Sequence, residues 1–117
     1  MQRSGAHNKL GSLGENLAAD FLIDKGYEIL ERNLDLNVGE IDLLCQKDDV
    51  LVVVEVKTVT KASAIDPVYK INPLKRKKLH LLCQIIAAKV PEQNIQCDGV
   101  IIVMNEQPTI THLQNIV

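Results

Sequence analysis

The 117-residue chain lacks any hydrophobic run long enough to cross a membrane. Its longest uninterrupted apolar segments, residues 50–54 and 100–104, contain five residues each, whereas a transmembrane helix needs about 20. The first nine residues, MQRSGAHNK, contain no apolar core of a signal peptide. We therefore expect a cytoplasmic protein that does not associate with membranes.

Cysteine is scarce, and its spacing fits neither a disulfide framework nor a zinc site. The three cysteines, Cys45, Cys83 and Cys97, are widely separated, odd in number and without a CxxC pair. We therefore predict that all three are small, buried, hydrophobic side chains. Patterns for a Ser-His-Asp triad, a phosphate-binding loop or a Rossmann dinucleotide site are also lacking.

The chain has no large excess of charge of either sign, because its formal net charge is −2. The distribution is uneven. Residues 11–66 contain 12 acidic and 5 basic side chains, whereas residues 67–91 contain no acidic and 6 basic ones. The acidic part could hold cations and the basic segment could hold phosphates, although a solvated helix face explains the basic segment equally well. The candidate nucleic-acid-binding residues in this segment are Lys70, Lys75, Arg76, Lys77 and Lys78.

Repeats and low-complexity linkers are lacking too, so we expect a single domain over residues 1–117, with residues 1–9 as a flexible tail. Apolar residues at helical spacing over 10–22 predict a helix that stops at Gly26. Asn72 and Pro73 predict the start of a second helix. Strands are expected at residues 27–34, 38–46, 50–58, 97–104 and 109–116. The order α-β-β-β-α-β-β predicts an α/β fold, a mixed sheet with helices packed on it.

The alternation of residues 38–46 predicts which side chains meet across the first hairpin. An even loop pairs Lys47 with Val50, and counting outward places Asp42 opposite Glu55. The same count places Glu40 opposite Lys57, and it puts Glu40, Asp42 and Leu44 on one face with Ile41, Leu43 and Cys45 on the other. Two directly opposed carboxylates destabilise a sheet. A bound divalent cation or the neighbouring Lys57 would relieve that repulsion.

This pair of carboxylates, followed by a lysine, suits phosphodiester hydrolysis. Asp42 and Glu55 could bind Mg²⁺ or Mn²⁺, which prefer oxygen ligands. Such a cation activates water and holds a phosphoryl oxygen. Lys57, two residues after Glu55 and on the same side of the strand, could position that water or stabilise transition-state charge.

Four segments together resemble the YraN-like family of small bacterial proteins. They are GENLA at 14–18, GYEILERN at 26–33, GEIDL at 39–43 and VVEVKT at 53–58, and the resemblance extends from about Gly11 to the C-terminus. That family is similar to archaeal Holliday junction resolvases and belongs to the PD-(D/E)XK nuclease superfamily. The resemblance implies a restriction-endonuclease-like three-layer core with a Mg²⁺-dependent site.

The resemblance also assigns roles to individual residues. It implies that Asp42 and Glu55 are metal ligands, that Lys57 is the catalytic lysine and that Glu15 is a further acidic site residue. Lys75 matches a lysine that recurs at the start of the family's second helix. Glu15 has an alternative explanation, because SLGE at 12–15 fits a capping box in which the glutamate caps its own helix. We interpret Glu40 as an ion-pair partner of Lys57, with a second ligand as the alternative.

The expected function is a metal-dependent endonuclease that hydrolyses DNA, with branched or structured DNA as its substrate. The alternative is a non-catalytic module that keeps the fold and binds nucleic acid or a protein, which the acidic pI of about 5.9 favours. The resemblance to resolvases also allows a homodimer, since two sites are needed to cut a junction symmetrically.

Overall fold

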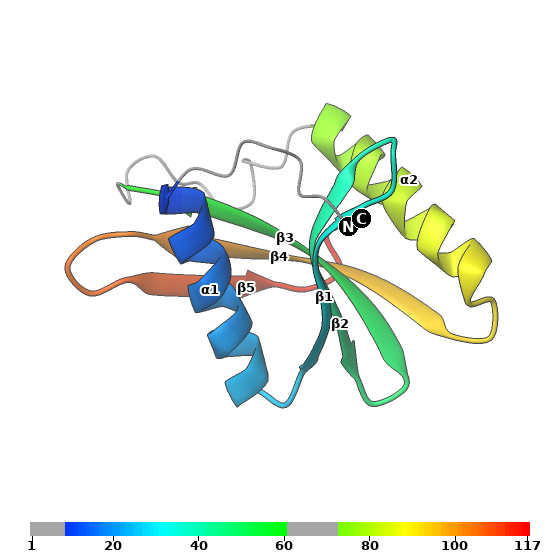
Figure 1. Ribbon diagram of the computed structural model, residues 1–117, viewed down its shortest axis with the longest axis horizontal. Coiled ribbons are helices and arrows are strands. Elements are labelled where there is room, and N and C mark those ends of the chain that lie inside the picture. The colour runs from blue at the N-terminus through cyan, green and yellow to red at the C-terminus, as the bar shows by residue number, and fades with distance from the viewer. Residues whose placement is uncertain (1–8, 61–72) are drawn as a thin grey trace.

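The computed structural model describes residues 9–60 and 73–117. The elements along these residues are α1 (Lys9–Asp24), β1 (Glu28–Asp35), β2 (Glu40–Lys47), β3 (Val50–Val59), α2 (Pro73–Lys89), β4 (Asn94–Val103) and β5 (Thr109–Leu113) (Figure 1). The predicted order α-β-β-β-α-β-β is confirmed. Residues 1–8 of the expected tail and the candidate Lys70 lie outside the described residues, and Lys9 already belongs to α1.

The described strands form one mixed sheet in the order β1-β2-β3-β4-β5. Neighbouring strands are antiparallel except for β3 and β4, which run parallel. Parallel neighbours need a crossover connection, and α2 lies in that connection. The two helices cover opposite faces of the sheet, so the fold is the expected three-layer α/β arrangement. Neither helix in the described part of the chain has the length and hydrophobicity to span a bilayer.

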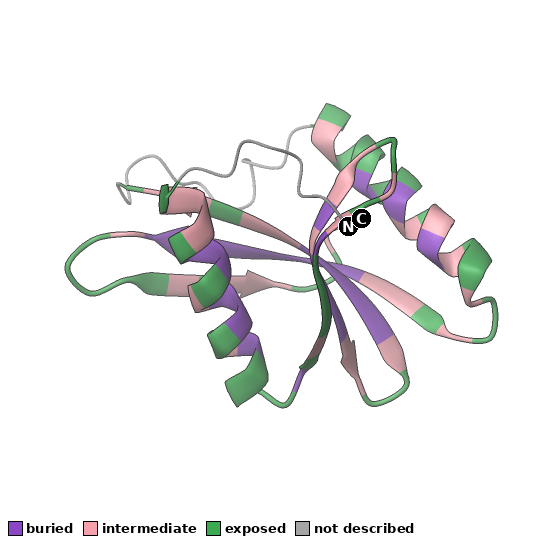
Figure 2. Cartoon of the chain, viewed as in Figure 1, coloured by how far each residue is buried: buried purple, intermediate pink, exposed green. Residues whose placement is uncertain are grey.

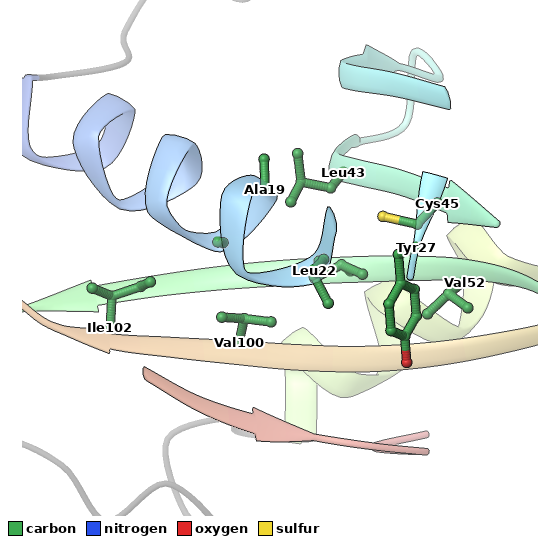
Figure 3. Packing of buried hydrophobic residues seen from close by; sticks show 10 residues of the cluster. Ala19, Leu22, Tyr27, Leu43, Cys45, Val52, Val100 and Ile102 are labelled. Carbon is green, nitrogen blue, oxygen red and sulfur yellow. The ribbon is translucent and has the colours of Figure 1, made fainter. Parts of the chain in front are cut away.

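The face of the sheet beneath α1 carries one hydrophobic core (Figure 3). Ala18, Ala19 and Leu22 of α1 are completely buried and pack against strand side chains. The partners on the strands include Leu43, Cys45, Val52, Val100 and Ile102. Alternate residues of the strands face this core, Leu43 and Cys45 on β2 and Val52 and Val54 on β3, as the period of two in a strand requires.

A second core lies between the sheet and α2. Leu79, Leu82 and Ile86 form the buried stripe of α2, and they pack on Leu44, Leu51, Val53 and Cys97 of the strands. Because both faces of the central strands are covered, β3 and β4 each contain an uninterrupted apolar run, residues 50–54 and 100–103. Figure 2 shows the buried segments concentrated in these central strands and on the inner sides of the helices.

The packing face of α1 follows the predicted helical spacing except at Leu13. Leu13, which the helical spacing places on the packed face, is 54% exposed, and the buried face is built around Gly14, Ala18 and Leu22. A Cβ atom on Gly14 would lie only 3.0 Å from the Cβ of Thr58 on β3. The small residues therefore let the backbone of α1 approach β3 closely, which brings the next residue, Glu15, near the end of the sheet.

The strict alternation predicted for β2 is wrong at Ile41. Leu43 and Cys45 face α1 as expected, but Ile41 packs in the α2 core together with Leu44 and Leu34. β2 remains paired with β1 as far as Glu40, whereas its pairing with β3 ends at Leu43. The end of the β1–β2 hairpin is therefore free to turn toward α2, as Figure 1 shows. This turn opens the sheet between β2 and β3, where the candidate site lies.

Candidate active site

The site begins where the pairing of β2 with β3 ends. The paired residues run from Lys47 and Val50 to Leu43 and Val54, which confirms the predicted register over that span. Asp42 and Glu55 are the next residues along each strand. The predicted opposition of Glu40 to Lys57 lies beyond this paired span, and in the structure Glu40 pairs with Asp35 of β1.

The carboxyl groups of Asp42 and Glu55 are in direct contact through a hydrogen bond. Asp42 Oδ2 also accepts a hydrogen bond of 2.8 Å from the backbone N–H of Val56. The side chain of Asp42 thus crosses to β3 just beyond the last paired residues. The predicted proximity of the two carboxyl groups is confirmed, and the bond to Val56 fixes one of them in place.

Burial controls the protonation of this acid pair. It raises the pKa of Glu55 to about 7, the negative charge of Asp42 adds to the effect, and the positive charge of Lys75 opposes it. Burial also raises the pKa of Asp42. The hydrogen bond from Val56 N–H is the largest of the effects that lower it. Two carboxyl groups in contact cannot both ionise easily, so the metal-free pair retains a proton near neutral pH.

A lysine from the opposite layer completes the contact. Lys75 Nζ lies 3.3 Å from Glu55 Oε1, and the Lys75 side chain is 39% exposed whereas that of Glu55 is 16% exposed. Pro73 is the first residue of α2 and Lys75 stands in its first turn, so the helix start brings the amine to the end of β3. The sequence placed Lys75 in a basic surface segment and at a helix start. Its contact with Glu55 became visible only in the fold.

Lys57 and Glu15 reach the same place from β3 and α1. Lys57 is exposed and follows Glu55 by two residues, which puts it on the same side of the strand. Glu15 is buried, with 9% of its surface exposed. Because α1 already begins at Lys9, Ser12 lies within the helix and cannot be its N-cap. The capping-box explanation of Glu15 is therefore wrong.

One cavity of about 280 Å³ joins these side chains. It is lined by Leu10, Gly11, Glu15, Asp42, Glu55, Val56, Lys57, Thr58 and Lys75. All four residues predicted to be catalytic line it, and they come from three different elements, with Lys75 added by a fourth. Within residues 9–60 and 73–117, no group of three or more His, Cys, Asp and Glu side chains is arranged to hold a metal ion. A cation here would have Asp42 and Glu55 as its protein ligands and water for the rest.

The basic segment divides into two parts in the structure. Lys75 turns toward the acid pair, whereas Arg76, Lys77 and Lys78 are exposed on α2. Lys77 and Lys78 line a separate cavity together with Val38 and Leu74, and none of the three lines the cavity of the acid pair. Phosphate binding by these three side chains stays a prediction.

The sequence did not reveal a second buried polar group, centred on Asp98 of β4. Asp98 is completely buried and accepts hydrogen bonds from His112 Nε2 at 2.8 Å, Gln96 Nε2 at 2.9 Å and the backbone N–H of Asn115 at 3.1 Å. The His112 ring also makes edge contacts with Phe21 and Tyr27. This network secures β5 and the segment after it to the sheet. None of its members lines the cavity of the acid pair.

Comparison with known proteins identifies the family. Residues 14–103 match the model of the uncharacterised protein family UPF0102, which spans most of the chain. The chain belongs to this family. The match confirms the resemblance to the YraN-like proteins and covers α1 from Gly14 onward, the acid pair and both central strands.

Individual UPF0102 proteins are similar over different shares of their length. A UPF0102 protein of Flavobacterium johnsoniae is 44% identical over 84 residues, which are 72% of this chain and 66% of that protein. One of Nitratiruptor is 41% identical over 105 residues, 89% of this chain and 91% of the other. One of Campylobacter fetus is 36% identical over 107 residues, 91% of both chains. The match thus spans just under two thirds of the Flavobacterium johnsoniae protein and nearly all of the other two.

Proposed function

We propose that this UPF0102 chain is a metal-dependent endonuclease that hydrolyses phosphodiester bonds of DNA. The observation that carries the proposal is the contact between the Asp42 and Glu55 carboxyl groups inside a solvent-open cavity that also receives Lys57 and Lys75. A purely structural sheet gains nothing from two touching carboxyl groups at its end, because burying them costs free energy unless a cation compensates.

The residues present fit a hard divalent cation. Mg²⁺ is commonly held by one or two carboxylates and keeps several waters, so two carboxylates beside an open cavity of about 280 Å³ suit it better than a closed protein cage would. When bound, the cation lowers the pKa of a coordinated water and polarises a phosphoryl oxygen. Its own charge would also displace the proton that the metal-free pair retains.

The protein side chains divide the remaining tasks. Val56 N–H holds the Asp42 carboxylate in a fixed direction through a bond of 2.8 Å, which preorganises the site. Lys57, exposed at the cavity, is free to contact the scissile phosphate and stabilise charge in the transition state. Lys75, which pairs with Glu55, keeps that carboxylate oriented. The buried Glu15 adds a third carboxyl group to the cavity lining, from the α1 side.

The proposed nucleic-acid partner would lie across the start of α2. Arg76, Lys77 and Lys78 are exposed there, directly after the lysine that contacts Glu55. Phosphates held by these side chains would position a neighbouring phosphodiester at the cavity without reading base sequence. The resemblance to junction resolvases is the reason for choosing branched DNA as the substrate and for expecting two chains to act together.

A cleavage assay tests this proposal. Linear, nicked, flapped and four-way DNA are incubated with the full chain, with and without Mn²⁺, beside Asp42→Asn and Asp48→Asn. Asp48 is exposed in the β2–β3 turn with a φ of 55°, a conformation that asparagine adopts readily, so Asp48→Asn is a matched control. We expect Mn²⁺-dependent cleavage by the wild type and by Asp48→Asn, and none by Asp42→Asn. Binding of DNA without cleavage by the wild type would favour the non-catalytic alternative.

A further inference from the structure

The fold brings together two cysteines that the sequence keeps apart. Cys83 of α2 and Cys97 of β4 both belong to the core between α2 and the sheet, and their side chains are joined by a hydrogen bond. Both line a cavity of about 220 Å³ together with His80, Gln96 and Asn115. Cys83 and Cys97 therefore form a pair of free thiols beside a cavity, and not the isolated, buried hydrophobic side chains that the sequence predicts.

The two thiols are chemically unequal. Cys97 is 3% exposed, whereas Cys83 is half-buried. The contact between the thiols lowers the pKa of Cys83, whereas the same contact and burial raise the pKa of Cys97. The thiolate is the reactive form of cysteine. Cys83 is therefore the more reactive of the pair, with a reduced partner already in contact with it.

We propose that Cys83 and Cys97 form an oxidisable dithiol that closes to a disulfide when the protein meets a peroxide. The product would tie α2 covalently to β4. Eight residues earlier on the same helix, Lys75 contacts Glu55, so the link would also fix the element that carries this lysine. The proposal does not depend on nuclease activity, because it concerns thiol chemistry in a cavity separate from that of the acid pair.

The oxidation balances with peroxide as the only co-reactant. The Cys83 thiolate attacks one oxygen of the peroxide, the O–O bond breaks, and Cys83 becomes a sulfenic acid as water or an alcohol leaves. The Cys97 sulfur then attacks the Cys83 sulfur, the S–O bond breaks, and hydroxide leaves with the proton of Cys97 as water. The two thiols lose two electrons and two protons in total, and the peroxide accepts them.

Cys45 provides an internal control within the same chain. It lies in the core beneath α1, on the other face of the sheet, and is completely buried (Figure 3). Burial, with the charge of Asp98, raises the pKa of Cys45 to about 12. Buried cysteines of this kind are inert, so a reagent that modified all three cysteines equally would be reporting unfolding.

The first test uses the wild-type chain under native conditions. Dilute folded protein is treated with hydrogen peroxide, the remaining peroxide is removed, and the protein is then alkylated in denaturant and analysed by intact mass and peptide mapping. We expect a monomer that has lost two hydrogens, a Cys83–Cys97 cross-linked peptide, alkylated Cys45, and full reversal by dithiothreitol. Oxidation of Cys83 to a sulfinic acid with Cys97 still reduced, or oxidation only through intermolecular dimers, would overturn the proposal.

Two variants test the role of the contact between the thiols. Cys97→Ser keeps a hydroxyl donor beside Cys83, whereas Cys97→Ala removes it. We expect iodoacetamide to alkylate Cys83 in Cys97→Ala more slowly than in Cys97→Ser by a factor of about three or more, while neither variant forms the disulfide. Equal alkylation rates in the two variants would show that the contact does not activate Cys83, and would contradict the assigned order of attack.

Discussion

Lys75 Nζ lies 3.3 Å from Glu55 Oε1, so the first turn of α2 is joined by an ion pair to the point where β3 becomes polar. This contact links two layers of the fold, and it places a positive charge beside two carboxyl groups that are themselves in contact. It is only partly shielded from solvent, because 39% of the Lys75 side chain is exposed. Lys75 therefore adjusts the charge of the acid pair while remaining partly open to solvent.

Replacing this lysine should change the protonation of the acid pair. Lys75 lowers the pKa of both Glu55 and Asp42, so in metal-free Lys75→Met protein the pKa of Glu55 should rise above its wild-type value of about 7. Lys77→Met, on the exposed part of the same helix, is the matched control and should leave it unchanged. Carboxyl carbon chemical shifts followed by NMR over pH measure the difference. Equal titration of Glu55 in all three proteins would contradict the assigned role of Lys75.

The acid pair should make metal-free stability depend on pH. The pKa of Glu55 is raised from 4.5 to about 7 on folding, so between these values the folded state binds a proton that the unfolded chain has released. The associated stability is fully present below about pH 4.5 and is lost as the pH rises through about 7. We expect the urea midpoint of the wild type to decrease as the pH rises from about 5 to about 8. The midpoint of Glu55→Gln should decrease less over the same range.

Glu28→Gln is the matched control for this pH series, because Glu28 is exposed on β1. Its urea midpoint should follow the wild-type pH profile. A wild-type midpoint that rises over the same range, or a Glu55→Gln profile identical to the wild type, would rule out the acid pair as the source of the pH dependence.

Gly14 should be intolerant of a side chain. Gly-to-Ala changes within helices usually stabilise by about 1 kcal/mol, but a Cβ here would lie 3.0 Å from Thr58 Cβ and closer still to Thr58 Oγ1. Overpacking of this kind typically costs about 1–3 kcal/mol, so Gly14→Ala should be destabilised in urea unfolding. Adding Thr58→Ala removes Oγ1 and Cγ2 and should restore part of the loss. Full stability of Gly14→Ala alone would show that α1 does not need this close approach.

Lys57 should matter for chemistry and not for folding. Its side chain is exposed, so Lys57→Met should keep the wild-type melting temperature. Loss of one preorganised transition-state donor typically costs about 10²–10³ in rate, and Mn²⁺-dependent DNA cleavage should fall by that factor. The alternative, a structural ion pair with Glu40, requires the reverse result, a lowered melting temperature with unchanged cleavage. Both measurements are made on the same sample.

Local patterns were sufficient to predict most of the fold. Period-two alternation and an even turn between Lys47 and Val50 predicted the hairpin register. A slip of one residue would move every side chain of the strand to the opposite face of the sheet. Pro73 marked the start of α2. The alternation failed at Ile41 because pairing with β3 stops at Leu43, and a repeat in sequence cannot indicate where a ladder ends.

The candidate site was only partly accessible from the sequence. Asp42 and Glu55 could be paired by counting along one hairpin, a local operation. The contact of Lys75 with Glu55 and that of Cys83 with Cys97 join α2 to the sheet, and such contacts depend on how a helix rotates and slides on its layer. Helical spacing fixes which residues share a stripe but not which strand residue each one meets.

Mn²⁺ binding to the metal-free chain tests the central claim most directly, since the proposed chemistry depends on a cation held by Asp42 and Glu55. Electron paramagnetic resonance of free Mn²⁺ during a titration measures that binding in the wild type, Asp42→Asn and Asp48→Asn. The account predicts saturable binding by the wild type and by Asp48→Asn, and loss of that binding in Asp42→Asn with the fold retained. Equal Mn²⁺ affinity in all three proteins would contradict it.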